Sequence, residues 1–359
     1  MDVLNRVEIH HSVVYDFLAS MYRLNNNEKF VSEIEELRLK DRIKLNDEIL
    51  NWVKKNKEIM PKNIQEKFDI FFNKETFYGL CLTCLVACSH IDTIDDFIDY
   101  ITELSYEDIL TEFLDTGFGT GEEISKALVQ ELLKSEKEAI LYINKNVSIP
   151  SKQKWELLQF FLNPGKMKED LVELFKWHYD NVYKYDMSTV EELIKKYEED
   201  LKEKLKKYGD DYLKLLTKID YKNYKPGDRI FISVSYFYET SRLYGYRDEP
   251  GMDIYMIGYR YSEIFVEGKH ALLSNVQMFK SLADETRLNM IKLLCERPWY
   301  GHELAMKLNL SNSTISYHLS MLGMNDFVKV DRIDNRAYFK SDIESIKKVV
   351  CESLDKMIE

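Results

Sequence analysis

Apolar residues recur at helical spacing over most of the first 220 residues. Only 6 Pro and 13 Gly interrupt the 359 residues, so long helices are expected to dominate. In the clearest run, a strict heptad fails at Lys204, which predicts one apolar face on a partner helix rather than a long coiled coil. The positions that define this face are Val190, Leu193, Ile194, Tyr197, Leu201, Leu205, Tyr208 and Tyr212.

The pattern changes to β-type sequence after Pro226-Gly227. Residues 229–238 (RIFISVSYFY) place apolar side chains at every second position, which is typical of a strand. A second segment of this kind, 252–261 (MDIYMIGYRY), follows the turn signal Pro250-Gly251. The strands near 229–261 are expected to form a small β-sheet or hairpin within a multi-helix N-terminal domain.

Shorter helices with tight connections begin near Gly268. We place a domain boundary between 262 and 274, or inside a continuous helix from Lys269 to Leu282. The predicted division is therefore 1–268 for the N-terminal region and 269–359 for the C-terminal domain. The expected fold class is mainly α.

The C-terminal domain contains the pattern of a helix-turn-helix. Residues 284–296 (DETRLNMIKLLCE) predict a first helix, with Leu288, Ile291 and Leu294-Cys295 as its core positions. Two further helices, 302–308 and 312–322, are joined by the turn Asn309-Leu310-Ser311.

The last of these helices has the polar face of a recognition helix. Its inward positions, at intervals of four and three, are Ile315, Leu319 and Leu322. The residues left outward lie near its N-terminal end, where a recognition helix meets base edges: Asn312, Ser313, Ser316 and Tyr317.

A basic ribbon follows the recognition helix. Residues 327–330 alternate as a strand, 331–335 are turn-like and 336–340 (RAYFK) return. This ribbon has the form of a wing, and its cations suit a phosphate backbone or a minor groove: Lys329, Arg332, Arg336 and Lys340.

These phrases carry a family resemblance. FKSLADETRLNMIKLL followed by LNLSNSTISYHLSMLGMNDFVKV resembles the ArsR family of bacterial winged-helix transcription regulators, over about 276–340. The resemblance implies a homodimer that binds double-stranded operator DNA through two recognition helices. The expected DNA-binding residues are Ser311, Asn312, Ser313, Thr314, Ser316, Tyr317, His318, Lys329, Arg332, Asn335, Arg336, Tyr338 and Lys340. For His318, support of the recognition helix and contact with phosphate both remain open.

The metal ligands of the family are missing from this sequence. Metal-sensing members carry Cys-x-Cys before an acidic residue and Leu, but here Tyr300 and His302 precede Glu303-Leu304. The final helix, 342–357, has no His, so the second metal site of the family is also absent. Asp326 replaces the usual Gly before Phe327, which can alter the turn into the wing. We therefore do not expect arsenic, zinc or cadmium as the inducer.

Three of the five cysteines form an alternative motif. Cys81, Cys84 and Cys88 lie on roughly one helical face with C-x2-C-x3-C spacing, near His90. The surrounding sequence, FYGLCLTCLVAC, is apolar, and Cys acts there as a small hydrophobe. Packing in the core is the preferred interpretation, while metal binding and redox or thiol chemistry remain as alternatives.

Other chemical motifs favour structural roles. Gly117, Gly119 and Gly121 follow no strand and precede two acids, which indicates a turn between helices rather than a phosphate loop. His10-His11 is interpreted as solvated or capping, and His178 as part of a packed aromatic helix face. Neither a catalytic triad nor a cofactor motif can be recognised, so an enzyme is not expected.

Charge and function divide along the chain in the same way. The net charge is −12, yet 275–359 contain 12 basic and 12 acidic residues, so all of the excess acid lies in the preceding residues. Asp2, Arg6 and Glu8 occur where a signal peptide would be apolar, and the odd number of cysteines favours the cytoplasm, without a membrane partner.

The N-terminal region is larger than dimerisation requires and rich in Tyr and Phe. It is expected to sense a small-molecule or peptide effector that is not a metal. Three alternatives remain for it: a dimerisation region, a protein-interaction domain, or an enzyme whose winged helix binds protein.

Overall fold

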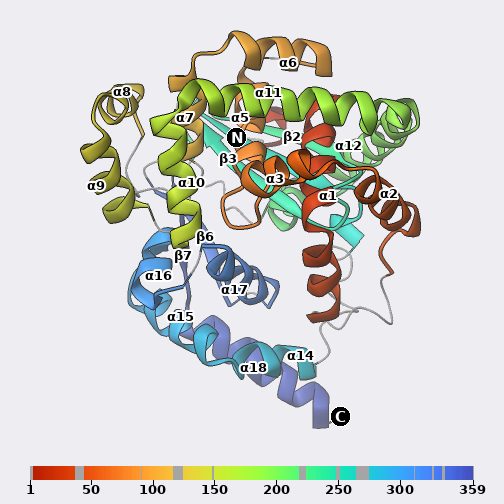
Figure 1. The fold of residues 1–359 in the computed structure, drawn as a ribbon. Helices are drawn as coiled ribbons and strands as arrows, with labels where there is room; N and C mark the ends of the chain where they lie inside the picture. The colour runs from red at the N-terminus through yellow and green to blue at the C-terminus, as the bar shows by residue number, and fades with distance from the viewer. Residues whose placement is uncertain are drawn as a thin grey trace.

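The N-terminal part of the protein is a mixed β-sheet surrounded by helices (Figure 1). The computed structural model describes residues 3–36, 44–89, 91–115, 124–147, 149–217, 224–247, 251–263, 275–310, 312–325, 327–333 and 336–358. The helices of the N-terminal part are η1 (Val3–Arg6), α1 (Val13–Glu36), α2 (Asp47–Glu58), α3 (Lys62–Phe71), α4 (Tyr78–Cys81), α5 (Thr83–Ser89), α6 (Ile94–Glu103), α7 (Tyr106–Leu114), α8 (Lys126–Lys134), α9 (Glu136–Asn146), α10 (Ser151–Leu162), α11 (Pro164–Asn181), η2 (Tyr183–Tyr185) and α12 (Met187–Thr217).

The sheet of this N-terminal body has the order β1-β2-β4-β3. Its strands are β1 (Val7–Ile9), β2 (Arg229–Ser235), β3 (Arg242–Arg247) and β4 (Met252–Gly258). The predicted sheet is confirmed, but its two predicted strands, β2 and β4, are parallel neighbours. The hairpin is formed instead by β3 and β4, which are antiparallel, and neither β3 nor β1 was predicted.

Both faces of the two central strands are buried. Every residue of β4 is buried, as is every residue of β2 after Arg229. Tyr15 of α1 contacts Phe231 on one face, while Arg242 donates to the carbonyl of Leu216 of α12 from the other. The one-sided alternation expected for 229–238 was therefore wrong, because helices cover the sheet on both sides.

The long helix α12 largely confirms the predicted apolar face. Val190, Ile194, Leu201, Leu205 and Tyr212 are buried. Tyr208 is 54% exposed and was wrongly assigned to the core. The helix breaks at the next residue, Gly209, where φ is 68°, so the apolar face resumes in a new phase and Tyr208 stacks on Tyr212.

The C-terminal part is a winged helix-turn-helix with a separate hydrophobic core. Its elements are α14 (Asn275–Leu282), α15 (Glu285–Glu296), β5 (Trp299–Tyr300), α16 (Gly301–Leu308), α17 (Asn312–Met324), β6 (Lys329–Ile333), β7 (Arg336–Lys340) and α18 (Ile343–Ile358). The three strands pair in the order β5-β7-β6. The predicted fold class, mainly α with a C-terminal winged helix, is confirmed.

Two details at the start of this part differ from expectation. The buried positions of α15 are Arg287, Met290, Ile291 and Leu294, whereas the predicted core residues Leu288 and Cys295 are exposed. The predicted boundary and the first residues of the helix from Lys269 fall mainly in 264–274, outside the described residues. Within the described ranges, no helix is both long and apolar enough to cross a membrane.

Candidate nucleic-acid interface

A capped junction between α14 and α15 supports the helix-turn-helix. The Asp284 carboxylate accepts from the backbone amide of Arg287 at 2.9 Å and so caps α15. The buried Arg287 guanidinium donates from Nε to the carbonyl of Ser281 at 2.6 Å and from Nη2 to that of Lys280 at 3.0 Å. These bonds satisfy carbonyls at the end of α14, which explains why Arg287 takes an inward position.

A left-handed residue makes the turn between α16 and α17. Asn309 has φ 54° and ψ 45°, a conformation that Asn tolerates better than most residues. The next amide, that of Leu310, donates to the carbonyl of Ala305 at 3.0 Å. Ser311, the last residue of the predicted turn, lies outside the described residues.

The recognition helix α17 packs as predicted. Ile315, Leu319 and Leu322 are buried in the C-terminal core. On the opposite side, the Ser316 side chain is exposed, and those of Thr314 and Tyr317 are partly exposed. Asn312 and Ser313 form the first turn of the helix. The start of α17 thus offers hydroxyl groups, which can hydrogen-bond to base edges or phosphates.

His318 lies on the inner side of α17. Its side chain is 8% exposed, and Nδ1 is 3.9 Å from Oδ1 of Asp284, the residue that caps α15. The imidazole also packs edge-on against the ring of Tyr317, with centroids 5.3 Å apart. This placement favours support of the recognition helix over direct contact with phosphate.

The wing brings two lysines to the same rung of its ribbon. Lys329 of β6 is the partner of Lys340 of β7, and Asp331 is the partner of Tyr338. Like charges that lie directly opposite one another destabilise a strand pair, so this rung favours an anionic ligand. Arg336 and Arg332 occupy neighbouring rungs, and Asn335 falls outside the described residues.

The positions where the family's thiolates would lie serve structural purposes here. The Tyr300 amide donates to the Glu303 carboxylate at 2.9 Å, and the Arg297 guanidinium pairs with the same carboxylate at 3.3 Å. His302 is buried, and desolvation lowers its pKa. Across the described ranges, no group of three or more His, Cys, Asp and Glu side chains could hold a metal ion.

The three clustered cysteines differ in exposure. Cys81 and Cys84 pack against the N-terminal core, where burial raises the pKa of the Cys84 thiol to about 12. Cys88 is exposed, so the prediction of core packing is confirmed for two of the three. A thiol with so high a pKa carries almost no thiolate at neutral pH, which disfavours thiol chemistry at Cys84.

The other predicted motifs have mixed outcomes. His178 is fully buried among aromatic rings, as predicted, with Nε2 2.8 Å from Oγ of Ser20. His11 is not solvated: its Nδ1 lies 3.2 Å from the buried Glu198 carboxylate. His10 lies 2.9 Å from Asp92. The glycines at 117–121 and His90 lie outside the described residues.

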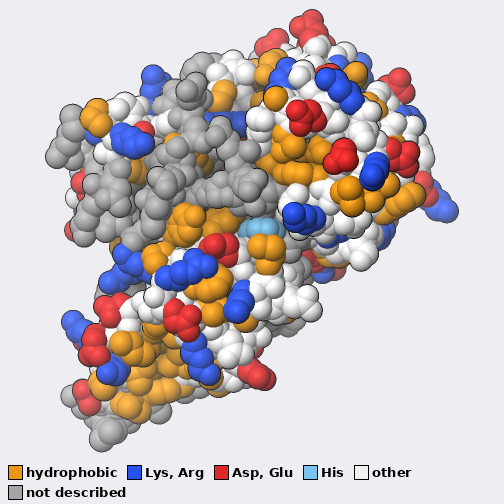
Figure 2. All heavy atoms as spheres, turned by 90° about the vertical axis from the view of Figure 1, so that its left-hand side faces the viewer, with side chains coloured by type: hydrophobic (Ala, Val, Ile, Leu, Met, Phe, Trp, Pro, Cys, Tyr) orange, Lys and Arg blue, Asp and Glu red, His pale blue; other side chains and the backbone are white. Residues whose placement is uncertain are grey.

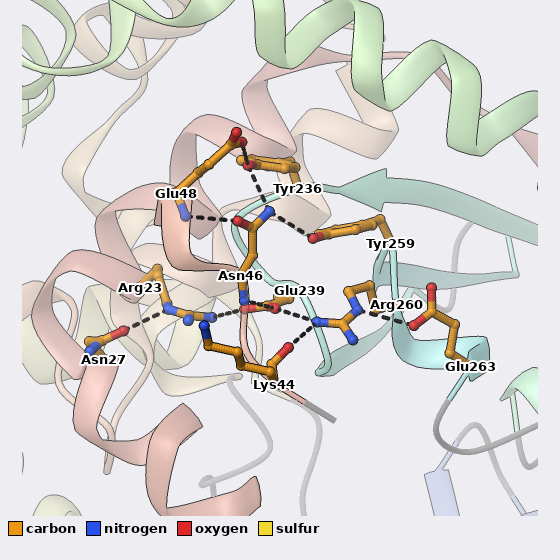
Figure 3. A network of polar contacts seen from close by, with 10 residues as sticks. All are labelled: Arg23, Asn27, Lys44, Asn46, Glu48, Tyr236, Glu239, Tyr259, Arg260 and Glu263. Atoms are coloured by element: carbon orange, nitrogen blue, oxygen red, sulfur yellow. Dashed lines mark hydrogen bonds and ion pairs between the residues drawn. The ribbon is translucent and has the colours of Figure 1, made fainter. Parts of the chain in front are cut away.

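Sequence reasoning missed a buried polar network in the N-terminal body (Figure 3). The Asn46 amide donates to the hydroxyls of Tyr236 and Tyr259, each at 3.0 Å, and the Asn46 backbone amide donates to Glu239 at 2.8 Å. These partners are about 190 to 213 residues apart in sequence, so no local pattern could identify them.

Comparison with known proteins places the similarity in the C-terminal part. The model of the family described as "Bacterial regulatory protein, arsR family" matches residues 284–330. An uncharacterized HTH-type transcriptional regulator of Bacillus subtilis (strain 168), YbzH, is 30% identical over 89 residues, which cover 21% of this chain and 89% of that protein. No solved structure matches the chain.

Proposed function

Through its C-terminal part the chain belongs to the bacterial ArsR family of DNA-binding regulators, and we propose that it is a repressor that binds its operator as a homodimer. In this proposal the N-terminal body senses an effector other than a metal ion and changes operator affinity. The protein acts in the cytoplasm, where its DNA target lies, and it is not an enzyme.

The observation that carries the proposed DNA contact is the lysine rung of the wing. Lys329 is exposed, and it lies across from Lys340 in the ribbon. A phosphate group between the two ammonium groups would offset their repulsion, which is a reason to keep two cations at one rung. We assign phosphate contact to Lys329, Lys340, Arg332, Arg336 and the neighbouring Asn335 and Tyr338.

Sequence reading is assigned to the start of α17. Hydroxyl and amide side chains there can hydrogen-bond in the major groove: Ser311, Asn312, Ser313, Thr314, Ser316 and Tyr317. The helix contains no Lys or Arg. Non-specific affinity is therefore modest, and binding depends on the wing and on two recognition helices acting together. His318 supports α17 from inside.

An apolar surface on the winged helix supports the proposed homodimer. Leu288 of α15 and Ile343 and Leu354 of α18 are exposed. Figure 2 shows hydrophobic side chains gathered at the bottom of the molecule, at the height of α15 and α18 in Figure 1. A second copy would bury this surface and place two α17 helices for the two halves of a palindromic operator.

Effector sensing is assigned to the N-terminal body because of its size and its aromatic core. This body contributes most of the aromatic contacts among the described residues, around Phe17, Phe237 and His178. The wing touches the body, since Val330 of β6 packs against the N-terminal core. An effector that prefers one arrangement of the body could therefore bias the wing.

Fluorescence anisotropy on the protein's own upstream DNA tests the proposed function. The full chain should bind that duplex more tightly than a shuffled duplex of equal length and composition. Ser316→Ala should reduce the ratio between the two affinities, since it removes an exposed hydroxyl of α17. Ser345→Ala, which alters a hydroxyl on α18, should leave the ratio unchanged. Absence of preference in the unmodified protein would contradict the proposal and favour a winged helix that binds protein.

A further inference from the structure

One buried carboxylate joins three distant segments of the N-terminal body. Glu239, between β2 and β3, is fully buried and lies 3.1 Å from Nη1 of Arg23 in α1. It also accepts from Nη1 of Arg260, after β4, at 3.1 Å and from the backbone amide of Asn46, before α2, at 2.8 Å (Figure 3). Such a buried group is costly unless its partners stay in place.

The backbone at Glu239 is held as closely as its side chain. Its φ of 30° is unusual for a residue with a side chain. Its carbonyl accepts from the amide of Arg260 at 2.9 Å, and a Cβ added to Gly258 would lie 2.3 Å from the same carbonyl oxygen. The end of β4 therefore cannot move without displacing Glu239.

On the α1 side, the same cluster spans a kink. Asn26 has non-helical backbone angles (φ −124°, ψ 30°), and Arg23 lies on the preceding turn. The Arg23 guanidinium donates from Nε to Asn27 at 3.0 Å and lies 4.2 Å from the ring centroid of Phe30, so it contacts residues beyond the kink. The direction of the second half of α1 thus depends on the guanidinium that Glu239 holds.

On the β4 side, the cluster holds the segment that leads toward the winged helix. The Arg260 guanidinium donates to the carbonyl of Lys44 at 2.7 Å and to the Glu263 carboxylate at 3.0 Å. The winged helix begins at Asn275, only a short stretch further along the chain. In Figure 1 the second half of α1 also extends beyond the sheet in the direction of the winged helix.

We propose that Arg23, Glu239 and Arg260 form a latch that transmits the state of the N-terminal body to the winged helix. When the latch is closed, the kink of α1 and the exit of β4 are fixed together, and so is the wing that packs on the body through Val330. When an effector shifts α1 or the β2–β3 connection, the buried carboxylate must change partners, which gives two discrete arrangements rather than a gradual one. This inference rests on the proposed function.

A second buried Arg–Glu pair provides a matched control. Arg247, at the end of β3, pairs with the buried Glu112 of α7. This pair joins two segments of the same body, but neither continues into the winged helix. A brace that only stabilises the fold should respond in the same way at both pairs, whereas a latch should respond only at Glu239.

The experiment compares Glu239→Gln with Glu112→Gln in the full chain. Gln keeps the shape of the side chain and removes its charge. For Glu239→Gln, we expect affinity for the upstream duplex to fall by about 10-fold, within the roughly 5- to 150-fold range typical of allosteric coupling. Hydrogen exchange should also become faster in 258–263 and in β6. Glu112→Gln should change the affinity by less than about twofold and leave β6 unchanged.

Two further measurements keep the test decisive. If Glu239→Gln fails to fold, Arg260→Lys offers a milder change, because it keeps the charge but loses the guanidinium geometry. Equal effects of the two Gln variants on affinity and on exchange in β6, or no effect of either, would overturn the latch. If the unmodified protein does not bind DNA, the proposed function fails, while exchange in β6 still decides whether Glu239 is coupled to the wing.

Discussion

The N-terminal body and the winged helix bury polar groups in different ways. In the winged helix, Arg287 donates to Ser281, only six residues away. In the body, Asp16 accepts from Ser235, which is 219 residues away. The winged helix is therefore organised by contacts that lie close together in sequence, and the body by contacts that form only after distant segments have met.

This difference has a consequence for how the two regions respond to change. A polar contact between neighbours forms with its own helix, as a cap does, and contributes a modest stability. A buried charge shared by distant segments makes each segment depend on the others, because removal of one partner leaves the rest desolvated. The body is thus suited to respond as a unit to an effector, while the winged helix remains a small module of constant shape.

Loss of Asp16 should have the largest effect, and only on the body. Its fully buried carboxylate accepts from Oγ of Ser235, from the amides of Tyr236 and Phe237, and from the Tyr183 hydroxyl. Asp16→Ala leaves these donors without an acceptor, so we expect a loss of about 3–5 kcal/mol in the free energy of unfolding. Urea denaturation followed by hydrogen exchange in β2 and in α15 would separate the two regions.

The control for this prediction is a solvated aspartate of the same body. Asp211 of α12 has a side chain that is 94% exposed, and Asp211→Ala should cost less than about 0.5 kcal/mol. A loss of similar size in α15 and in β2 after Asp16→Ala would show that the two regions unfold together, against the comparison drawn above.

A change in the core of α17 should give the opposite result. Ile315 is buried against the other apolar side chains of the C-terminal core. Ile315→Ala should cost about 2–4 kcal/mol in the winged helix, through lost apolar burial and the remaining cavity. Exchange should accelerate in α15 and α17 and stay unchanged in β2.

Met306 of α16 offers a matched position, because its side chain is 55% exposed. Met306→Ala should cost less than about 0.5 kcal/mol. If Ile315→Ala also accelerates exchange in β2, the winged helix is not an independent module.

The same contrast explains what the sequence could predict. The helix-turn-helix was predictable because its determinants lie within short phrases, such as Asp284 capping the helix that contains Arg287. The errors in α15 arose because Arg287, a charged residue, takes an inward position and Leu288 faces outward. Periodicity alone ranks these two residues the other way.

In the body, sequence patterns predicted the helices but not the way they assemble. The three residues of β1 form a strand only because β2, more than 220 residues further along, lies beside them. The latch has no sequence signal, since Arg23 and Glu239 are separated by 216 positions and each is of a type that is usually exposed. The candidate DNA-contact residues, in contrast, all follow from the local pattern and the family resemblance.

Removal of one cation from the wing should affect DNA binding without affecting either core. Lys329 is exposed and lies across from Lys340. Lys329→Ala should weaken binding to operator and shuffled duplexes alike, by roughly 3- to 10-fold at moderate salt, and reduce the slope of log affinity against log salt by about 1. Anisotropy titrations at several salt concentrations measure both quantities.

Lys347→Ala is the control for charge alone, because Lys347 is an exposed cation on α18 that pairs with Glu344. It should leave the salt slope unchanged. An equal reduction by both variants would mean that net charge, rather than the wing, determines binding.

The smallest expected effect is a pH dependence confined to the body. His11 follows β1, and its Nδ1 lies 3.2 Å from the buried Glu198 carboxylate of α12. This hydrogen bond raises the pKa of His11, against the opposing effect of burial. The folded body therefore favours protonated His11, and its contribution is complete below the ordinary value of about 6.5 and is lost as pH rises through the raised pKa.

Another histidine of the body acts in the opposite direction, so the comparison must be made between variants. Burial lowers the pKa of His178 to about 3, so stability from its neutral form is lost as pH falls below about 6.5. The difference between the unmodified protein and His11→Gln removes this shared contribution. In urea unfolding monitored in β2, that difference should shrink as pH rises above about 6.5. Monitored in α15, it should be absent at every pH. A difference that is constant with pH in β2 would mean that His11 and Glu198 are not coupled through the proton, and a difference in α15 would mean that the two regions share one response.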